Sequence, residues 1–94
     1  MANGIKKEYT ANDATGTTLK HNGKTGAFLV GIPSGTTATV ELSHAVGSED
    51  VVIETFTASG GAQFISPLGT LKLKVTNYSG SGTVTAIVRP LNEH

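Results

Sequence analysis

The chain has no cysteine among its 94 residues, which excludes disulfide bonds and zinc sites built on thiolates. It also has no tryptophan, and aromatic residues make up only 5% of it. A chain of this length forms one small domain that buries a limited share of its surface, so its stability margin is thin. With disulfides and thiolate metal sites absent, association with other protein chains is the remaining common source of extra stability.

Charge is also scarce. Charged residues form 15% of the chain, and seven basic residues balance seven acidic ones, for a formal net charge of zero. Nucleic-acid binding needs clustered cations, often with aromatic side chains for stacking, and Lys6-Lys7 beside Tyr9 is too small a group for that. The composition therefore predicts no nucleic-acid partner.

Long hydrophobic runs are missing too. No apolar stretch approaches the roughly 20 residues that a membrane-spanning helix needs, so we expect no membrane partner. The first residues, "MANGIKK", lack the apolar region of a secretory signal. We therefore expect the chain to be made and folded in a cytoplasm.

A two-residue apolar period is what the sequence does contain, from Thr17 onward. In 71–75 the leucines and Val75 alternate with lysines, and similar alternation runs through 37–43 and 84–88. Turn signals rich in Gly, Pro, Asn and Ser recur every eight to twelve residues, and no stretch has a helical period. This pattern predicts an all-β fold of seven to eight short antiparallel strands, in a β-sandwich or a small barrel.

The first 16 residues are polar and show no sustained period. We assign residues 1–16 to an N-terminal arm and residues 17–94 to a single β domain. The arm is either a loosely held chain end or a segment that becomes ordered on a neighbouring protein. In the second case Ile5 and Tyr9, its large apolar side chains, are candidate contact residues.

Two turns predict hairpins. Asn22-Gly23 suits a tight type I′ turn, because Asn and Gly tolerate positive φ. The run 79–82, "SGSG", separates two alternating segments and predicts a closing hairpin over residues 71–91. The strand 27–32, "AFLVGI", is apolar on both faces, which predicts that it is covered on both sides.

The segment 51–57, "VVIETFT", has an ambiguous register. Glu54 argues that its own face is in water, which would leave Val52 and Phe56 partly exposed. We therefore include Val52 and Phe56 among the candidate protein-contact residues, together with Tyr78 as a lone aromatic near a turn.

No group of residues predicts catalysis. The histidines, His21, His44 and His94, have no metal-ligand spacing, and the acidic pair in 48–50 fits a solvated turn better than a calcium site. The serines cluster with glycine in turns, without a positioned base to activate them. We expect no enzyme activity, no catalytic or metal-binding residue and no cofactor.

Two longer stretches carry a resemblance. They are "GAFLVGIPSGTTATVELSHAV" and "VVIETFTASGGAQFISPLGTLKLKVTNYSGSGTVTAIVRPL". In the order and composition of their strands, residues 25–91 resemble small virion structural proteins of tailed bacteriophages. The resemblance implies a capsid decoration (cement) protein that binds and stabilises the head shell, with the virion as its final location. It also implies the major capsid protein or other virion proteins as partners, and a homo-oligomer, either a dimer or a trimer.

Two other functions stay open. One is a structural component of the phage neck or tail. The other is a β-sandwich module that binds carbohydrate or a cell surface, although such modules usually present exposed Trp or Tyr and this chain has little of either.

Overall fold

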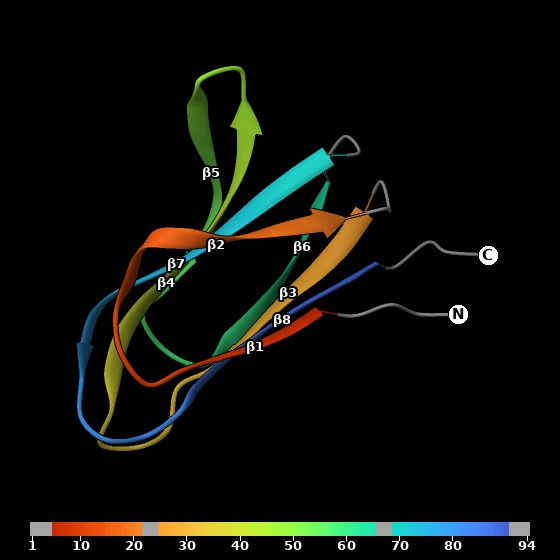
Figure 1. The fold of residues 1–94 in the computed structure, drawn as a ribbon. Coiled ribbons are helices and arrows are strands. Elements are labelled where there is room, and N and C mark those ends of the chain that lie inside the picture. The colour runs from red at the N-terminus through yellow and green to blue at the C-terminus, as the bar shows by residue number, and fades with distance from the viewer. Residues whose placement is uncertain (1–4, 22–24, 66–68, 91–94) are drawn as a thin grey trace.

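The computed structural model describes residues 5–21, 25–65 and 69–90, and in this part of the chain every regular element is a β-strand. The strands are β1 (Ile5–Tyr9), β2 (Asp13–His21), β3 (Thr25–Gly31), β4 (Thr37–Val46), β5 (Glu49–Phe56), β6 (Gly60–Ile65), β7 (Gly69–Ser79) and β8 (Val84–Pro90). They form two four-stranded antiparallel sheets, ordered β1-β8-β3-β6 and β2-β7-β4-β5. The sheets pack as a sandwich and do not close into a barrel (Figure 1). The all-β prediction is confirmed.

The strand pairing is nested about one hairpin. β4 pairs with β5 across a two-residue loop, Gly47-Ser48, and Gly47 has the positive φ, 62°, that glycine provides at the first position of type II′ turns. Outside this hairpin β3 pairs with β6, β2 with β7 and β1 with β8. Successive pairs alternate between the two sheets, and the pairings β3–β8 and β4–β7 complete each sheet. A long hairpin folded over itself in this way is an eight-stranded jelly roll.

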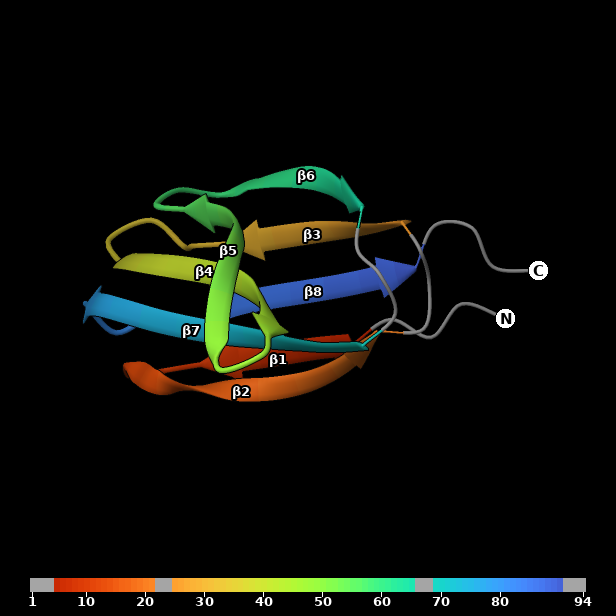
Figure 2. The ribbon, with the colours of Figure 1, turned by 90° about the horizontal axis from the view of Figure 1, so that it is seen from above.

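The predicted hairpins are wrong. β7 and β8, the strands of residues 71–91, lie in opposite sheets, so the "SGSG" turn carries the chain across the sandwich (Figure 2). β2 and β3 also lie in different sheets, and the Asn22-Gly23 turn between them is outside the described residues. The reason is physical: a two-residue period states which side chains face inward, but it does not state which strand is the partner.

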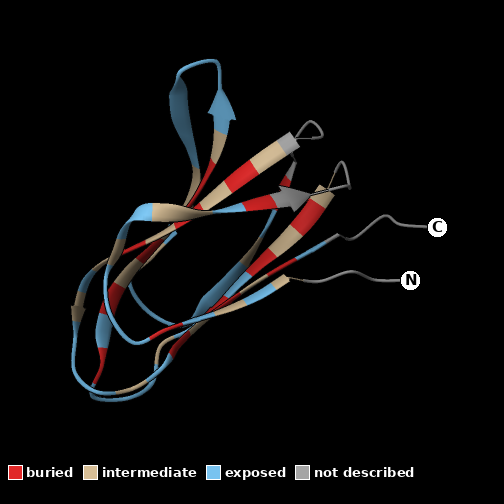
Figure 3. Cartoon of the chain, in the orientation of Figure 1, coloured by how far each residue is buried: buried red, intermediate tan, exposed pale blue. Residues whose placement is uncertain are grey.

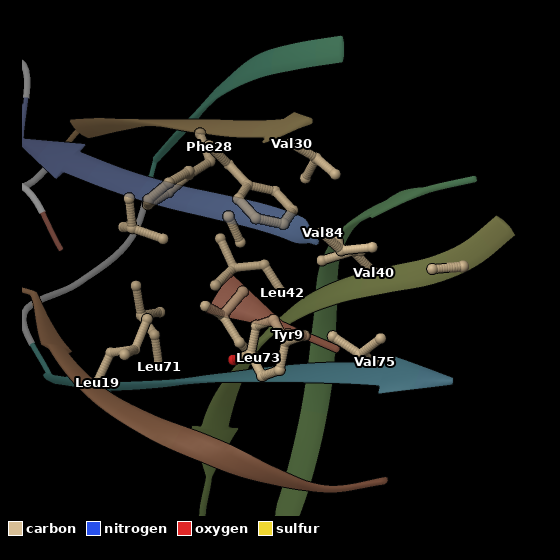
Figure 4. Packing of buried hydrophobic residues seen from close by; sticks show 14 residues of the cluster. Tyr9, Leu19, Phe28, Val30, Val40, Leu42, Leu71, Leu73, Val75 and Val84 are labelled. Atoms are coloured by element: carbon tan, nitrogen blue, oxygen red, sulfur yellow. The ribbon is translucent and has the colours of Figure 1, made fainter. Parts of the chain in front are cut away.

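The inward faces of residues 37–43, 71–75 and 84–88 are as predicted. The buried apolar side chains come from both sheets and interdigitate between them (Figure 4). They are Tyr9, Leu19, Phe28, Val30, Ala38, Val40, Leu42, Phe64, Leu71, Leu73, Val75, Val84, Ala86 and Val88. Branching at Cβ lets the valines fill a pleated surface with few rotamers lost.

Residues 1–16 were assigned to an arm, whereas Ile5–Tyr9 forms an edge strand paired with β8 and the start of β2 follows soon after. Ile5, Lys7 and Tyr9 share the inward face of β1. Because Lys7 lies between Ile5 and Tyr9 on that face, the sequence shows no regular apolar alternation there, and the strand was not predicted. Within the described residues, the N-terminal segment is therefore part of the sandwich and contributes Tyr9 to its core.

Candidate interaction surface

Polar contacts near the N-terminus serve the backbone. The Tyr9 hydroxyl donates to Thr17 Oγ1 at 3.2 Å, and the Thr17 hydroxyl donates to Asp13 Oδ2 at 2.6 Å. The Gly16 N–H donates to the other carboxylate oxygen of Asp13 at 3.2 Å. Asp13 thus anchors the irregular stretch of β2 between Asp13 and Thr17, and this network has a structural explanation that needs no substrate.

Among the described residues, Tyr9 alone has a pKa that is clearly displaced from its ordinary value. Burial raises the pKa of the Tyr9 phenol above its ordinary value; the side-chain hydrogen bond with Thr17 lowers the pKa, and the nearby charge of Asp13 raises it. The phenol is therefore neutral at physiological pH and acts as a hydrogen-bond donor.

The described residues show no group suited to metal chemistry. No three His, Asp or Glu side chains gather closely enough to hold an ion in the part of the chain that the structure describes. Nor does any helix there have the length and apolar character for crossing a bilayer.

The most conspicuous surface is the end of the β4–β5 hairpin, residues 44–52, which we call the hairpin tip. It projects beyond the body of the sandwich and is almost entirely exposed (Figures 1 and 3). Three of its valines are open to solvent: Val46 is 56% exposed, and Val51 and Val52 are each 49% exposed. Large apolar side chains rarely gather on a protruding, otherwise solvated element without a partner to cover them.

A β-bulge sets how the hairpin tip is presented. Leu42 pairs with Glu54 and Ser43 pairs with Val52, so Ile53 is an extra residue in β5. A bulge bends the strand and increases its twist, which accounts for the way β5 turns away from the sheet in Figure 1. The bulge also resolves the ambiguous register of residues 51–57. Odd-numbered residues of β5 face inward before Ile53, and even-numbered residues face inward after it.

Phe56 and Val52 consequently have different surroundings. Phe56, opposite Val40, is half-buried and its ring lies 5.4 Å from that of Phe28, tilted by 59°. Val52, opposite Ser43, stays exposed on the other face. On that face Asp50 forms ion pairs with Lys72 at 3.2 Å and Lys74 at 3.7 Å, which tie the base of the hairpin tip to β7.

The five candidate contact residues are not brought together. Ile5 packs partly buried on the core, and Tyr9 lies within it. The Tyr78 hydroxyl donates to the carbonyl of Gly82, and the Tyr78 backbone N–H donates to Asn12 Oδ1 at 2.8 Å. Val52 alone of the five presents a largely open apolar side chain.

Val46 and Val51 were missed by sequence reasoning, and both lie at the hairpin tip beside Val52. The signal was available: Gly47-Ser48 is a two-residue hairpin loop, so apolar residues that flank it lie at the end of a hairpin where the sandwich offers little cover.

His44 lies at the base of the hairpin tip, opposite Val51 in β5 and Leu71 in β7. Both of its ring nitrogens are buried, and neither has a hydrogen-bond partner among the described residues. Buried polar atoms are nearly always paired, and an unpaired one costs about 1–3 kcal/mol.

Replacing His44 with leucine is therefore expected to raise the free energy of unfolding by about 1 kcal/mol, because the unpaired nitrogens are removed and the volume is nearly kept. Urea denaturation followed by circular dichroism measures this change. Thr37→Leu, at an exposed position of the same strand, is the control and should leave stability within about 0.5 kcal/mol. A less stable H44L protein would contradict the prediction.

Comparisons of the chain with protein-family models, with curated proteins and with solved structures give no match.

Proposed function

We propose that this chain is a non-enzymatic structural protein of a tailed-bacteriophage virion, and that it decorates and stabilises the head shell as a cement protein. The observation that carries the proposal is the hairpin tip: three exposed valines on a projecting hairpin that no part of the described chain covers. A protein that acts by attachment needs such a docking element and needs no reactive site.

The fold and composition are in keeping with this role. Jelly rolls occur in viral capsid domains, although they also occur in lectins and cupins, so the fold by itself does not select a function. The resemblance of residues 25–91 to small phage virion proteins favours the first of these. A chain without cysteine folds without oxidation, which suits assembly in a host cytoplasm before incorporation into the virion.

The hairpin tip has the chemistry of a protein contact. Val46 and Val51 lie on the same face of the hairpin as Glu49, so they form a patch of apolar surface bordered by charge, as in the apolar centre and polar rim of protein interfaces; Val52 lies on the other face with Asp50. We propose the major capsid protein, or another virion protein exposed at the shell, as the partner that covers this patch.

The carbohydrate-binding alternative is less well supported. Sugar platforms stack on exposed aromatic rings. All five aromatic residues lie in the described part of the chain, and each is buried or half-buried. A neck or tail location would use the same kind of contact as a head location, and the experiment separates the two.

Replacing Val51 with aspartate is expected to weaken binding to phage heads by at least about tenfold, because docking would then bury an unpaired charge. Co-sedimentation with purified heads, and separately with purified tails, measures the binding. Val51 is exposed, so the variant should keep the wild-type circular dichroism spectrum.

Thr18→Asp is the matched control, since Thr18 is exposed on β2, at the opposite edge of the same sheet. Equal binding by V51D and the wild type would refute a role for the hairpin tip. Binding to tails but not heads would place the protein in the neck or tail. Retention on a glycan array without binding to either particle would favour the carbohydrate module.

A further inference from the structure

Three of the four strands at the sheet edges carry features that discourage pairing with another chain. β1 has Lys6, Lys7 and Glu8 in its five residues. β2 is interrupted by the register shift after Asp13, and β5 by the bulge at Ile53. Charges and bulges of this kind protect exposed edges from edge-to-edge association.

β6, "GGAQFI", has no such protection. It contains no charged residue and no proline, and it pairs with β3 in an unbroken register from Thr25–Ile65 to Val30–Gly60. It is the last strand of its sheet, and none of the described strands runs along its outer side in Figure 2. The residue that precedes the strand is held in place, because Ser59 Oγ accepts from the Ile32 N–H at 2.8 Å and donates to the Ile32 carbonyl at 3.2 Å.

The side chain of Leu29, on the neighbouring strand β3, extends over Gly61 of this edge strand. Leu29 on β3 pairs with Gly61 and is 41% exposed on the outer face of the sheet. A Cβ at Gly61 would lie 2.5 Å from Leu29 Cδ2, so the leucine fills the space above β6 that a side chain at position 61 would take. The sequence predicts that residues 27–32, which include most of β3, are covered on both faces. In a single copy the outer face of β3 is open at Leu29.

From these observations we infer that β6 pairs with β6 of a second copy of this chain, antiparallel and about a two-fold axis, to form a continuous eight-stranded sheet. Opposite residues in an antiparallel pair point to the same face, so the axis passes between two copies of one residue. With Ala62 opposite Ala62, Gly61 faces Gln63 of the second copy. That glutamine stem then lies against the exposed Leu29.

Charge is the reason why the occupant is a second copy. When an edge strand pairs with its own copy, every charged residue in it lies near the same charged residues of the second copy. β5 would bring the carboxylates of its Glu49, Asp50 and Glu54 together, whereas β6 brings together no charge at all. An isologous pair of this kind closes at two copies and leaves no further β6 edge open.

Sedimentation analysis of the full chain over a range of concentrations tests this inference without any virus particle, so its outcome is independent of the proposed function. The average mass is expected to rise reversibly from the 9.6 kDa of one chain to twice that value and to stop there. Gln63→Lys should weaken the dimer at least tenfold, because it places lysines close together across the axis. Gln63→Glu should do the same, and an equimolar mixture of Q63K and Q63E should restore pairing.

Thr10→Lys is the control, since it adds the same charge at an exposed site just after β1, at the far edge of the same sheet, and should leave the dimer unchanged. Circular dichroism verifies that each variant is folded. A wild type that stays at the mass of one chain up to millimolar concentration overturns the inference, and so does a mass that grows beyond two chains. Equal dimerisation by Q63K and the wild type overturns it as well.

Discussion

Replacing Gly80 with alanine is expected to lower the free energy of unfolding by about 3 kcal/mol or more. Gly80 has a φ of 112°, a conformation that costs a residue with a side chain about 1–3 kcal/mol. An added Cβ would also lie 2.6 Å from the carbonyl oxygen of Gly35 and 2.9 Å from the Cα of Thr36. Both are backbone atoms, so the turn between β7 and β8 has to move to admit the methyl group.

The consequence is large because this turn joins the two sheets. The Gly82 N–H donates to Thr36 Oγ1 at 2.9 Å, and a Cβ on Gly82 would lie 2.4 Å from the ring of Pro33. Shifting residues 79–82 therefore disturbs the facing turn 33–36 as well. Domains have a total stability of about 5–15 kcal/mol, so the loss is a substantial fraction of it.

Urea denaturation followed by circular dichroism measures the effect, with Gly31→Ala as the matched control. Gly31 lies in a strand, has no positive φ, and has no atom within 4 Å of the position of an added Cβ. The same substitution there should change stability by no more than about 1 kcal/mol. Similar stabilities for G80A and G31A would show that the crossing turn is not tightly packed.

The contrast between these glycines also marks what can be predicted from the sequence. The alternation of 71–75 and 84–88 correctly predicts which side chains are buried, because side chains in a strand alternate between faces. The Ser-Gly run correctly predicts a turn. Whether that turn joins neighbours in one sheet or crosses to the other depends on the packing of Gly82 against Pro33 and Thr36, which are distant in sequence.

The candidate surface was predicted in part for similar reasons. Val52 is exposed as expected, but Glu54 did not mark a solvated face: it pairs with the buried Leu42 and shares the inward face of β5 with Phe56. The extra residue at Ile53 places Phe56 on the inward face instead of beside Val52, and a bulge has no reliable signature in so short a segment. The prediction that residues 27–32 are covered on both faces is wrong for the described chain, because Leu29 is 41% exposed on the outer face of β3.

Phe28→Ala is expected to have the other large effect, a loss of about 3–5 kcal/mol in the free energy of unfolding. Phe28 is completely buried. It lies on β3, a central strand of its sheet, which pairs with both β6 and β8. Its ring also packs on that of Phe56, so removal leaves a cavity and deprives Phe56 of its contact.

The neighbouring residue provides the control. Leu29→Ala also removes apolar volume, but Leu29 lies on the opposite face of β3 and is 41% exposed. The free energy of unfolding should therefore fall by less than about 1 kcal/mol. Both variants are measured by urea denaturation at a concentration at which the wild type is a single chain. A greater loss for Leu29→Ala than for Phe28→Ala would mean that β3 is inverted by one residue, and with it the sheet that β3 shares with β6 and β8.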